Sequence, residues 1–275
     1  MSNPKEPKDI FMLCESIATE QELSKYFNNL NYKGNFKFDG ERVMACKKGE
    51  DIILFNRRGN IITYKFSEVV KALSLIKSDF MIDGEVISFD NDFTKLQSRA
   101  LTKDKVKIAE LEKTIPVKFM IFDILSIGEK IIMKEPLKQR LCYLQELLAE
   151  NKDNHLEMCA YGDIKSLLSL AIEKEGEGII VKDMNGSYEN KRSKNWYKYK
   201  LFKEMTITIT GFSDNPKGIR ATDDLGNAVQ IAGFQSNEVK QKLEQEGCAT
   251  ISVQYLAKTK DNRLRFPSFR GLING

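Results

Sequence analysis

The sequence predicts an α+β fold class, with antiparallel sheets in a large first domain and a small β-barrel, such as an OB-fold, in a second domain. Short runs rich in Ile, Val and Phe and bounded by Gly, Asp or Asn indicate strands and hairpins. Helical stretches with apolar residues on one face interrupt these runs. The length of 275 residues suits two domains and allows a sizeable core without disulfide or metal staples.

The first domain has clear element signals. The segments expected to form a strand or a hairpin are 37–47, 51–66, 79–90 and 117–125. The expected helices are 20–27, 67–77, 136–151 and 163–176. The third helix has Pro136 in its first turn, and the fourth has Asp163 at the cap position and Gly176 at its end. These end signals support the helical interpretation of both segments.

A change in composition near residues 203–206 predicts the domain boundary. The stretch 191–203 contains six Lys or Arg and no acidic residue. Beyond it, 207–212, 227–234 and 249–258 are typical of strands, and 237–247 is typical of a helix. Five short strands with one helix in about 70 residues favour an OB-fold. We therefore expect domains at 1–203 and 204–275.

Composition excludes several classes of function. Lys and Arg (43) exceed Asp and Glu (39) by four, which argues against a purely electrostatic nucleic-acid binder. The single histidine, His155, excludes a His-rich metal site and argues against a His-based triad. Five cysteines without a C-x-x-C spacing, and no signal-peptide or membrane-spanning run, indicate a cytoplasmic protein with reduced thiols. The P-loop and G-x-G-x-x-G patterns are absent.

The most informative segment is Lys-Phe-Asp-Gly-Glu-Arg at 37–42. Lys37 and Asp39, two apart on an extended strand, point to the same face, and a turn at Gly40 returns Arg42 toward the same pocket. A nucleophilic lysine must lose its proton, and nearby cations or a bound metal lower its pKa. Taken alone, the segment also fits an ordinary strand–turn–strand with an exposed Lys–Asp pair.

Five further segments follow in order: Asn56-Arg57-Arg58-Gly59, Asp83-Gly84-Glu85, Phe122-Asp123, Glu177-Gly178-Ile179-Ile180-Val181-Lys182 and Lys198-Tyr199-Lys200. Together the six segments resemble the motifs of the covalent nucleotidyltransferases and are most similar to those of ATP-dependent DNA ligases. Three other stretches favour a ligase over a capping enzyme: Phe93-x-x-Leu96-Gln97-x-Arg99, Pro136-Leu137-x-x-Arg140 and Arg265-Phe266-Pro267-Ser268-Phe269-Arg270-Gly271. The resemblance covers nearly the whole chain.

The resemblance implies an ATP-grasp-like nucleotidyltransferase (adenylation) domain before the OB-fold, in a minimal two-domain ligase of viral or bacterial type. It implies that Lys37 attacks the α-phosphorus of ATP and carries AMP, that AMP passes to the 5′-phosphate of a nick, and that the 3′-hydroxyl displaces it. The implied partner is nicked double-stranded DNA, with no membrane contact. The implied state is a monomer in the cytoplasm of a bacterial cell or a virus-infected host cell.

The resemblance also implies a role for each candidate residue. Those implied in catalysis are Lys37, Lys198 and Lys200. Those implied in nucleotide binding are Asn35, Phe36, Arg42, Arg57, Glu85, Phe122, Lys182, Lys198 and Lys200. Those implied in binding Mg²⁺ or Mn²⁺ are Glu177, Asp39 and Glu85, because hard oxygen ligands suit these ions. Those implied in DNA binding are Arg42, Arg57, Arg58, Arg192, Lys194, Arg263 and Arg265.

Each of these residue types also has an ordinary structural interpretation. Lys198 and Lys200 fit a solvated basic strand, Phe122 fits core packing, and Glu177 fits a surface acid after a helix. The basic stretches 191–203 and 254–270 fit either phosphate-tracking strips or solvated surface. Only the order of the motifs favours the functional interpretation.

Two departures from the family pattern stand out. Family members usually carry an Arg a little beyond the Arg-Phe-Pro stretch, followed by an acid and a Lys, where this chain has Leu272-Ile273-Asn274-Gly275. The resemblance implies that this motif orients the pyrophosphate leaving group during adenylylation of the enzyme. Unless the sequence is truncated, we expect either a slower adenylylation or that Arg265 or Arg270 takes over this role. Asn35 occupies a position where ligases often have a Glu, and its carbonyl can still accept a hydrogen bond from the adenine amino group.

Two alternatives remain open on the sequence. One is another covalent nucleotidyltransferase, either an RNA ligase or an mRNA capping guanylyltransferase. The other is a nucleic-acid-binding module that kept the fold and lost turnover.

Overall fold

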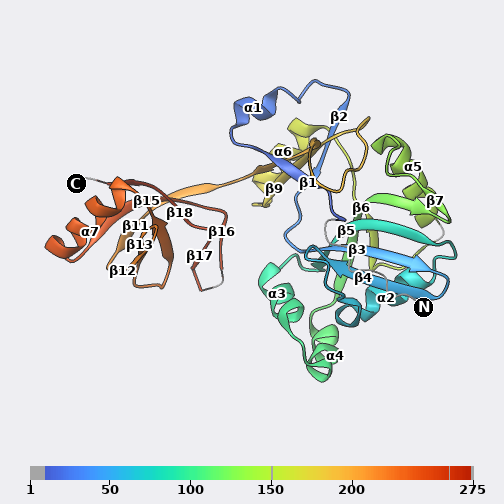
Figure 1. Ribbon diagram of the computed structural model, residues 1–275, viewed down its shortest axis with the longest axis horizontal. Helices are drawn as coiled ribbons and strands as arrows, with labels where there is room; N and C mark the ends of the chain where they lie inside the picture. Colours follow the sequence, from blue (N-terminus) through green and yellow to red (C-terminus); the bar gives the residue numbers. More distant parts are fainter. Residues whose placement is uncertain (1–9, 150, 260, 274–275) are drawn as a thin grey trace. The chain divides into compact units, whose positions relative to one another are not determined.

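The computed structural model describes residues 10–149, 151–259 and 261–273. The chain divides into two compact units, Met1–Tyr199 and Lys200–Gly275 (Figure 1). Asn274 and Gly275, which stand where the family's C-terminal motif was expected, lie outside the described residues.

The larger sheet of the first unit is mostly antiparallel, as predicted. Its strands run in the order β4-β3-β5-β6-β7, with β8 beside β6. The strands are β3 (Glu41–Lys48), β4 (Asp51–Asn56), β5 (Phe80–Ser88), β6 (Val117–Ile127), β7 (Lys130–Ile131) and β8 (Leu156–Met158). The strands predicted at 79–90 and 117–125 are confirmed as β5 and β6.

Two segments that were expected as strands or hairpins contain shorter strands than predicted. In 37–47 the strand begins only at Glu41, because residues 37–40 form the connection from β2 (Tyr32–Phe36) to β3. In 51–66 the strand ends at Asn56, the chain turns back so that Phe55 and Ile61 form an antiparallel bridge, and Thr63–Lys65 forms a short 3₁₀ helix. A tight turn explains the second break, because the Asn56 side-chain oxygen accepts hydrogen bonds from the Arg58 and Asn60 amides.

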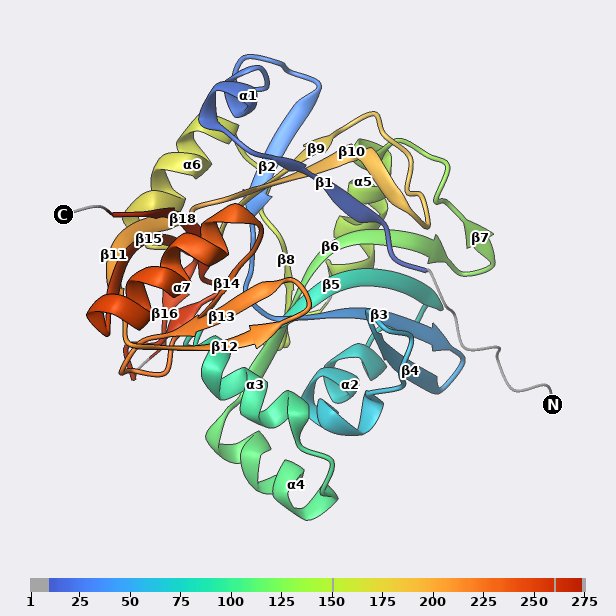
Figure 2. The ribbon, with the colours of Figure 1, turned by 60° about the vertical axis from the view of Figure 1, so that its left-hand side comes forward.

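A second, smaller sheet lies beside the first (Figure 2). Its order is β1-β10-β9-β2, from β1 (Leu13–Ile17), β10 (Arg192–Lys200), β9 (Gly178–Asp183) and β2. The β2–β9 pair is antiparallel, whereas β1 pairs with β10 in parallel. This sheet joins segments from both ends of the unit, and the sequence pattern did not predict the β1 strand.

Helices cover the outer faces of the two sheets. The six helices of the described part of this unit are α1 (Glu20–Ser24), α2 (Ser67–Ser74), α3 (Phe93–Leu101), α4 (Lys105–Thr114), α5 (Leu137–Leu148) and α6 (Ile164–Glu173). Four of them were predicted, and the cap at Asp163 is confirmed because its carboxylate accepts from the Ser166 amide at 2.8 Å. Helices α3 and α4 were not predicted, although α3 carries the Phe93-to-Arg99 motif.

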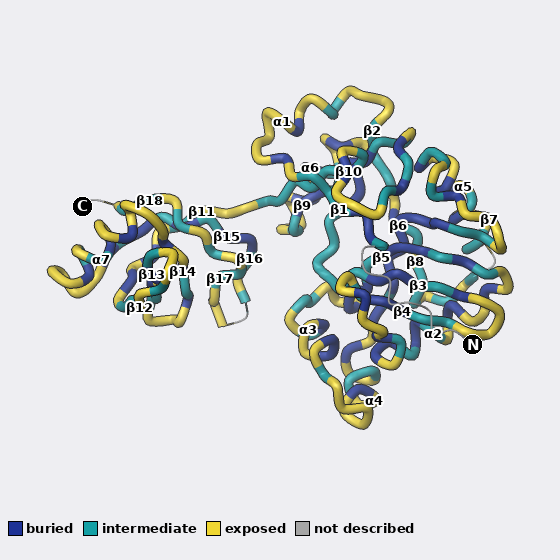
Figure 3. Tube along the Cα trace, viewed as in Figure 1, coloured by how far each residue is buried: buried dark blue, intermediate teal, exposed yellow. Residues whose placement is uncertain are grey.

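Two separate cores hold this unit together. Their buried residues are dark blue in Figure 3. One fills the space between the larger sheet and α2 and α5, with Phe66, Phe119 and Leu144 completely buried. The other lies on the opposite face of that sheet and includes Phe122 and Trp196, which come from β6 and β10. The second core therefore joins the two sheets, and the candidate site is built on it.

Two of the motif arginines form buried ion pairs that stabilise the fold. Arg99 is completely buried and binds both carboxylate oxygens of Glu68, at 2.5 and 2.7 Å. Arg140 is completely buried and binds both oxygens of Asp123, at 2.7 and 2.8 Å. Removal of either arginine would leave a buried carboxylate without its counter-charge, which is strongly destabilising.

The second unit consists of short antiparallel strands and one helix in its described part. The elements are β11 (Lys203–Ile209), β12 (Gly211–Asn215), β13 (Gly218–Thr222), β14 (Ala228–Ile231), α7 (Phe234–Glu246), β15 (Ala249–Tyr255), β16 (Ala257–Lys258), β17 (Leu264–Arg265) and β18 (Ser268–Leu272). They form the sheets β11-β15-β18, β12-β13-β14 and β16-β17 around a core that includes Ile209, Val229 and Ile251. Across residues 10–273, apart from 150 and 260, no helix is long and apolar enough to cross a membrane.

Candidate active site

The pairing of β2 with β9 brings Lys37 and Glu177 together, although they are 140 positions apart in the sequence. The Lys37 amide donates to the Gly178 carbonyl at 2.9 Å, directly after the paired residues Phe36 and Ile179. The Lys37 ammonium then donates to Glu177 Oε2 at 2.6 Å. The side chains are 21% and 7% exposed, so this ion pair is largely shielded from water. A lysine nucleophile of this kind needs an adjacent group that orients it and receives its proton.

Gly40 is required in the connection that follows Lys37. A Cβ atom at this position would lie only 2.3 Å from the carbonyl oxygen of Val86 and 2.8 Å from the Glu85 side chain. The chain therefore passes β5 in direct backbone contact before it enters β3. This close approach keeps the Lys37 segment and the start of β3 against the same part of the sheet.

Arg42 is locked inside a buried polar network. Its guanidinium donates to both oxygens of Asp83, at 3.1 and 2.7 Å, and Tyr188 donates its hydroxyl to the same carboxylate at 2.7 Å. The guanidinium also lies over the rings of Phe11, at 5.1 Å, and of Trp196, at 5.5 Å. Although burial opposes the charge, Asp83 raises the pKa of Arg42 above its ordinary value. Arg42 thus stays protonated and bidentate with Asp83, an arrangement that does not resemble a surface DNA contact.

Lys182 lies in an aromatic box. Its Nζ atom is 3.9 Å from the Trp196 ring centroid and 4.3 Å from that of Phe122, and it donates to the Tyr161 hydroxyl at 2.8 Å. Only 1% of the residue is exposed. Burial lowers the pKa of Lys182 to about 8. The box therefore holds a hydrogen-bond donor whose charge changes near neutral pH.

Asn35 contributes a buried acceptor beside this box. The residue is 2% exposed, and its Oδ1 atom has no hydrogen-bond partner within the part of the chain that the structure describes. Burial raises the pKa of Cys159, against the opposing effects of the Lys182 charge and of a hydrogen bond from the Asn35 side chain. An unpaired buried carbonyl is unfavourable unless a ligand satisfies it.

Phe36 differs from its neighbours in where its side chain lies. Successive residues of a strand alternate between faces, so Phe36 lies on the face opposite to Asn35 and Lys37. Its ring is 6.0 Å from the Nζ atom of Lys174, beyond the end of α6. The role in nucleotide binding that the resemblance implies for Phe36 stays a prediction.

The expected metal ligands do not form a ready-made site. No group of three or more His, Cys, Asp or Glu side chains within the described ranges is arranged to hold a metal ion. Burial raises the pKa of Glu85 to about 8, against the opposing charges of Lys37 and Arg42. Glu177 is occupied by Lys37. A cation at this place would need ligands from a substrate as well.

The remaining predicted cations come from other segments of the chain. Arg57 and Arg58 are exposed in the turn after β4, and Arg192 and Lys194 are exposed at the start of β10. Lys198 and Lys200 share a face of β10 by strand alternation. In the second unit, Arg263 is exposed before β17, which contains Arg265, and Lys200 Nζ lies 5.3 Å from the Phe266 ring.

Sequence reasoning missed three residues of the site. Tyr188 and Tyr161 supply hydroxyls to Asp83 and Lys182, and Phe11 supplies a ring under Arg42. Tyr188 and Tyr161 lie in connections outside named strands and helices, and Phe11 precedes β1, so no periodic pattern marked them. A buried aromatic in an otherwise polar loop, such as Ser-Tyr-Glu-Asn at 187–190, was the available signal.

Together, these features fit the class of nucleotidyltransferases. Residues 11–200 match the family described as ATP dependent DNA ligase domain, and the chain belongs to this family. The resemblance found in the sequence is therefore confirmed.

Relatives differ in how much of their length the chain covers. The chain is 30% identical over 207 residues to DNA ligase 1 of Methanosarcina barkeri. This match covers 69% of the chain and 38% of the relative. The chain is 28% identical over 265 residues to the SPbeta prophage-derived DNA ligase-like protein LigB of Bacillus subtilis, which covers 90% of this chain and 94% of that one.

Solved structures share the fold along nearly the whole chain. A Lig E DNA ligase structure superimposes with a TM-score of 0.68 at 18% identity, covering 96% of this chain and 98% of that one. The ATP-dependent DNA ligase of bacteriophage T7 in complex with ATP gives a TM-score of 0.53 at 20% identity, covering 97% and 99%. The predicted α+β class is confirmed, while the barrel closure of the second unit stays a prediction.

Proposed function

We propose that this protein is an ATP-dependent DNA ligase that joins a 3′-hydroxyl to a 5′-phosphate at nicks in duplex DNA. The observation that carries the proposal is the contact of Lys37 Nζ with Glu177 Oε2 at 2.6 Å, in a chain of the ligase-domain family. A half-buried amine beside a carboxylate is suited to covalent catalysis.

The reaction has three phosphoryl-transfer steps. First, Lys37 Nζ bonds to the α-phosphorus of ATP and pyrophosphate leaves. Second, a 5′-phosphate oxygen of the nick bonds to that phosphorus and the P–N bond breaks, so that AMP moves to DNA. Third, the 3′-hydroxyl bonds to the 5′-phosphorus and AMP leaves. Before the first step, the ammonium of Lys37 loses a proton, and Glu177 Oε2 lies in hydrogen-bond contact to receive it.

Asn35 and Lys182 support adenine as the base. Adenine offers an amino donor next to the N1 acceptor, whereas guanine offers a carbonyl acceptor next to an N1–H donor. The Asn35 carbonyl, which has no partner within the described residues, suits the amino group, and the Lys182 ammonium suits N1. This pair of groups favours ATP over GTP and therefore a ligase over a capping guanylyltransferase. Phe122 is the proposed stacking ring.

Cations around the pocket would hold the phosphates. We assign Lys198 and Lys200 to the α-phosphate, and Arg42 and Arg57 to the ribose and the nick phosphate. The assignment of Arg42 favours the ribose, because Asp83 already binds two of its nitrogens. Neutralising charge on the transferring group is the main catalytic task in such reactions.

The carboxylates fit a divalent cation that shares its ligands with a substrate. Mg²⁺ and Mn²⁺ are commonly bound by one or two carboxylates together with substrate phosphates, so the lack of a three-residue cluster among the described residues is compatible. Glu177, Glu85 and Asp39 are the proposed ligands. Such a cation would neutralise phosphate charge.

DNA is the proposed partner, bound through its backbone. The proposed contacts are Arg58, Arg192, Lys194, Arg263 and Arg265. We keep the proposed domains at 1–203 and 204–275, the second as an OB-fold, which its short antiparallel strands and single helix support. A monomer in the cytoplasm is the proposed state.

Adenylylation of the protein tests the first step. Incubation with α-³²P-ATP and Mg²⁺ is expected to label the wild-type protein and a Lys48→Ala control, whose lysine is exposed at the end of β3. Lys37→Ala is expected to lose the label and ATP-dependent sealing, because the nucleophile is gone, yet to retain sealing of a pre-adenylylated nick. A wild-type protein that takes no label with Mg²⁺ or Mn²⁺ contradicts the proposal.

The substrate panel separates the alternatives. Labelling by GTP in place of ATP would identify a guanylyltransferase, and sealing of nicked RNA only would identify an RNA ligase. Failure to seal even pre-adenylylated nicked DNA, combined with DNA binding, would identify a module without turnover.

A further inference from the structure

Tyr188 is completely buried and uses both hydrogen-bonding capacities of its hydroxyl. The hydroxyl donates to Asp83 Oδ2 at 2.7 Å and accepts from the backbone amide of Met12 at 3.0 Å. The tyrosine comes from the connection between β9 and β10, whereas Met12 precedes β1 and Asp83 lies in β5. One hydroxyl therefore ties three segments that are distant in the sequence.

The same Asp83 oxygen serves Arg42. Asp83 Oδ2 accepts from Arg42 Nη2 at 2.7 Å as well as from Tyr188. Asp83 is itself completely buried, so its rotamer is set by these contacts and by packing. Because the Tyr188 hydroxyl holds the carboxylate, both carboxylate oxygens are presented to the Arg42 guanidinium in a fixed geometry.

The N-terminal segment completes the arrangement. The Phe11 ring lies 5.1 Å from the Arg42 guanidinium, and Met12 is completely buried. The Glu189 amide donates to the Met12 sulfur at 3.1 Å, so the two segments that meet at Tyr188 hold each other in place. Arg42 therefore lies between a ring from one segment and a carboxylate oriented by the other.

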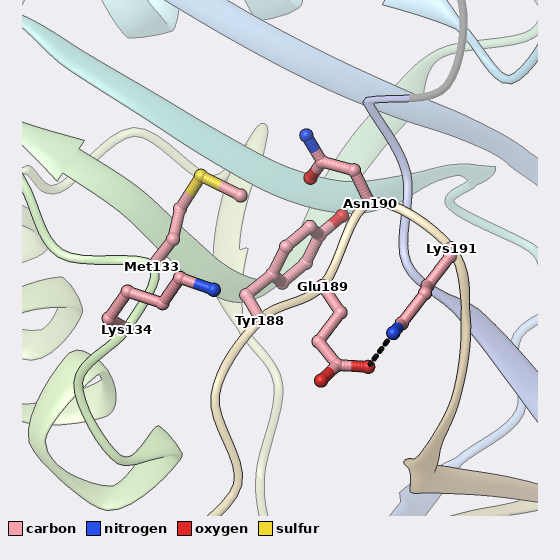
Figure 4. A pocket seen from close by; sticks show the side chains of 6 residues that line it. All are labelled: Met133, Lys134, Tyr188, Glu189, Asn190 and Lys191. Carbon is pink, nitrogen blue, oxygen red and sulfur yellow. Dashed lines mark ion pairs between the residues drawn. The ribbon is translucent and has the colours of Figure 1, made fainter.

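Packing also restrains the Tyr188 ring, which is completely buried. The Trp196 ring meets it edge to face, with centroids 5.6 Å apart. Figure 4 shows the tyrosine among the residues that line a pocket of about 440 Å³: Met133, Lys134, Tyr188, Glu189, Asn190 and Lys191. The ring is thus held by packing and its hydroxyl by two hydrogen bonds.

We propose that Tyr188 is a positioning residue that orients Arg42 through Asp83. It acts without contact to the nucleotide, and its effect reaches ATP only through Arg42. The inference rests on the proposed function, because it requires Arg42 to bind the ATP that adenylylates Lys37.

A double-mutant cycle tests the proposal. Rates of lysyl-AMP formation are measured against ATP concentration for the wild type, Tyr188→Phe, Arg42→Lys and the double variant. Loss of the hydroxyl is expected to reduce the second-order rate constant about tenfold, mainly through a weaker apparent affinity for ATP, since hydrogen bonds to charged groups have about this effect. In the Arg42→Lys background, Tyr188→Phe is expected to add no further loss.

Tyr143→Phe is the matched control, because its hydroxyl accepts a hydrogen bond from the exposed Lys130 side chain and has no contact with Asp83 or Arg42 among the described residues. It is expected to match the wild type. Melting temperatures of all variants show whether a substitution has damaged the fold. If Tyr188→Phe acts independently of Arg42, the rate losses of the two single variants multiply in the double variant. That result, or a Tyr188→Phe rate equal to that of the wild type, overturns the inference. A wild-type protein that never forms lysyl-AMP instead overturns the proposed function.

Discussion

The buried acceptor of Asn35 and the buried donor of Lys182 have complementary chemistry. One is a carbonyl oxygen without a partner in the described part of the chain, and the other is an ammonium held among aromatic rings. Both are costly to bury in an empty protein. A ligand that accepts from one and donates to the other would offset that cost, which is a physical reason to place the base there.

Glu85 gives a pH-dependent prediction at the residue scale. Burial raises its pKa from 4.5 to about 8, so the folded protein holds this proton more tightly than the unfolded chain. The resulting stabilisation is complete below the ordinary pKa of 4.5 and is lost as the pH rises through about 8. We expect Glu85→Gln to flatten this part of the pH profile, as measured by melting temperature from about pH 5 to about pH 9.

Glu146→Gln serves as the control for that measurement, because Glu146 is exposed on α5. It is expected to keep the wild-type profile. Parallel profiles for Glu85→Gln and the wild type would mean that the Glu85 proton is not held by the fold.

At the scale of the elements, the contact between the Lys37–Gly40 connection and β5 decides the geometry of the site. The local conformation of neither segment brings them together. Their approach is set by the β3–β5 register, which pairs Arg42 with Glu85 and Glu41 with Val86. The sheet thereby brings two of the sequence motifs side by side.

Gly40→Ala is the prediction that belongs to this contact. The added methyl would lie 2.3 Å from the Val86 carbonyl oxygen, a backbone atom that cannot move alone. We expect a loss of about 2 to 3 kcal/mol in the free energy of unfolding, with loss of lysyl-AMP formation. Gly271→Ala is the control, because no atom lies within 4 Å of its added Cβ. Equal melting temperatures for the two variants would refute the close contact.

At the scale of the whole molecule, the net charge does not show where the exposed cations lie. The net charge is only +4, yet exposed cations such as Arg58, Lys194 and Arg263 occur in both units. Binding to a DNA backbone depends on such local neutralisation of phosphates and releases counterions. The overall balance therefore understates the capacity of the surface to bind nucleic acid.

Arg263→Ala tests this at the same scale. Loss of one phosphate contact is expected to weaken binding to nicked duplexes of any sequence and to lower the slope of log affinity against log salt by about 1. Fluorescence anisotropy across a salt series measures both quantities. Lys138→Ala, on the exposed side of α5, is expected to leave the slope unchanged. A sequence-selective loss at Arg263 would indicate base contact instead.

Local patterns were sufficient for the strands β5 and β6 and for four helices, whereas the contact between Lys37 and Glu177 was not predicted. Runs of apolar residues and cap residues act over a few positions, so they are readable without a fold. The side of β2 on which Phe36 lies was also readable from strand alternation.

What the sequence by itself determined was the α+β class, the family and the motif residues, because these depend on residue types in linear order. Only the tertiary structure decided that Asp83 binds Arg42, that Tyr188 holds Asp83, and that Asn35 is left with an unpaired carbonyl. These contacts span up to about a hundred positions, and they exist only because sheet pairing and the second core bring distant segments together. The buried polar partners of a site are selected by that packing and have no local signature.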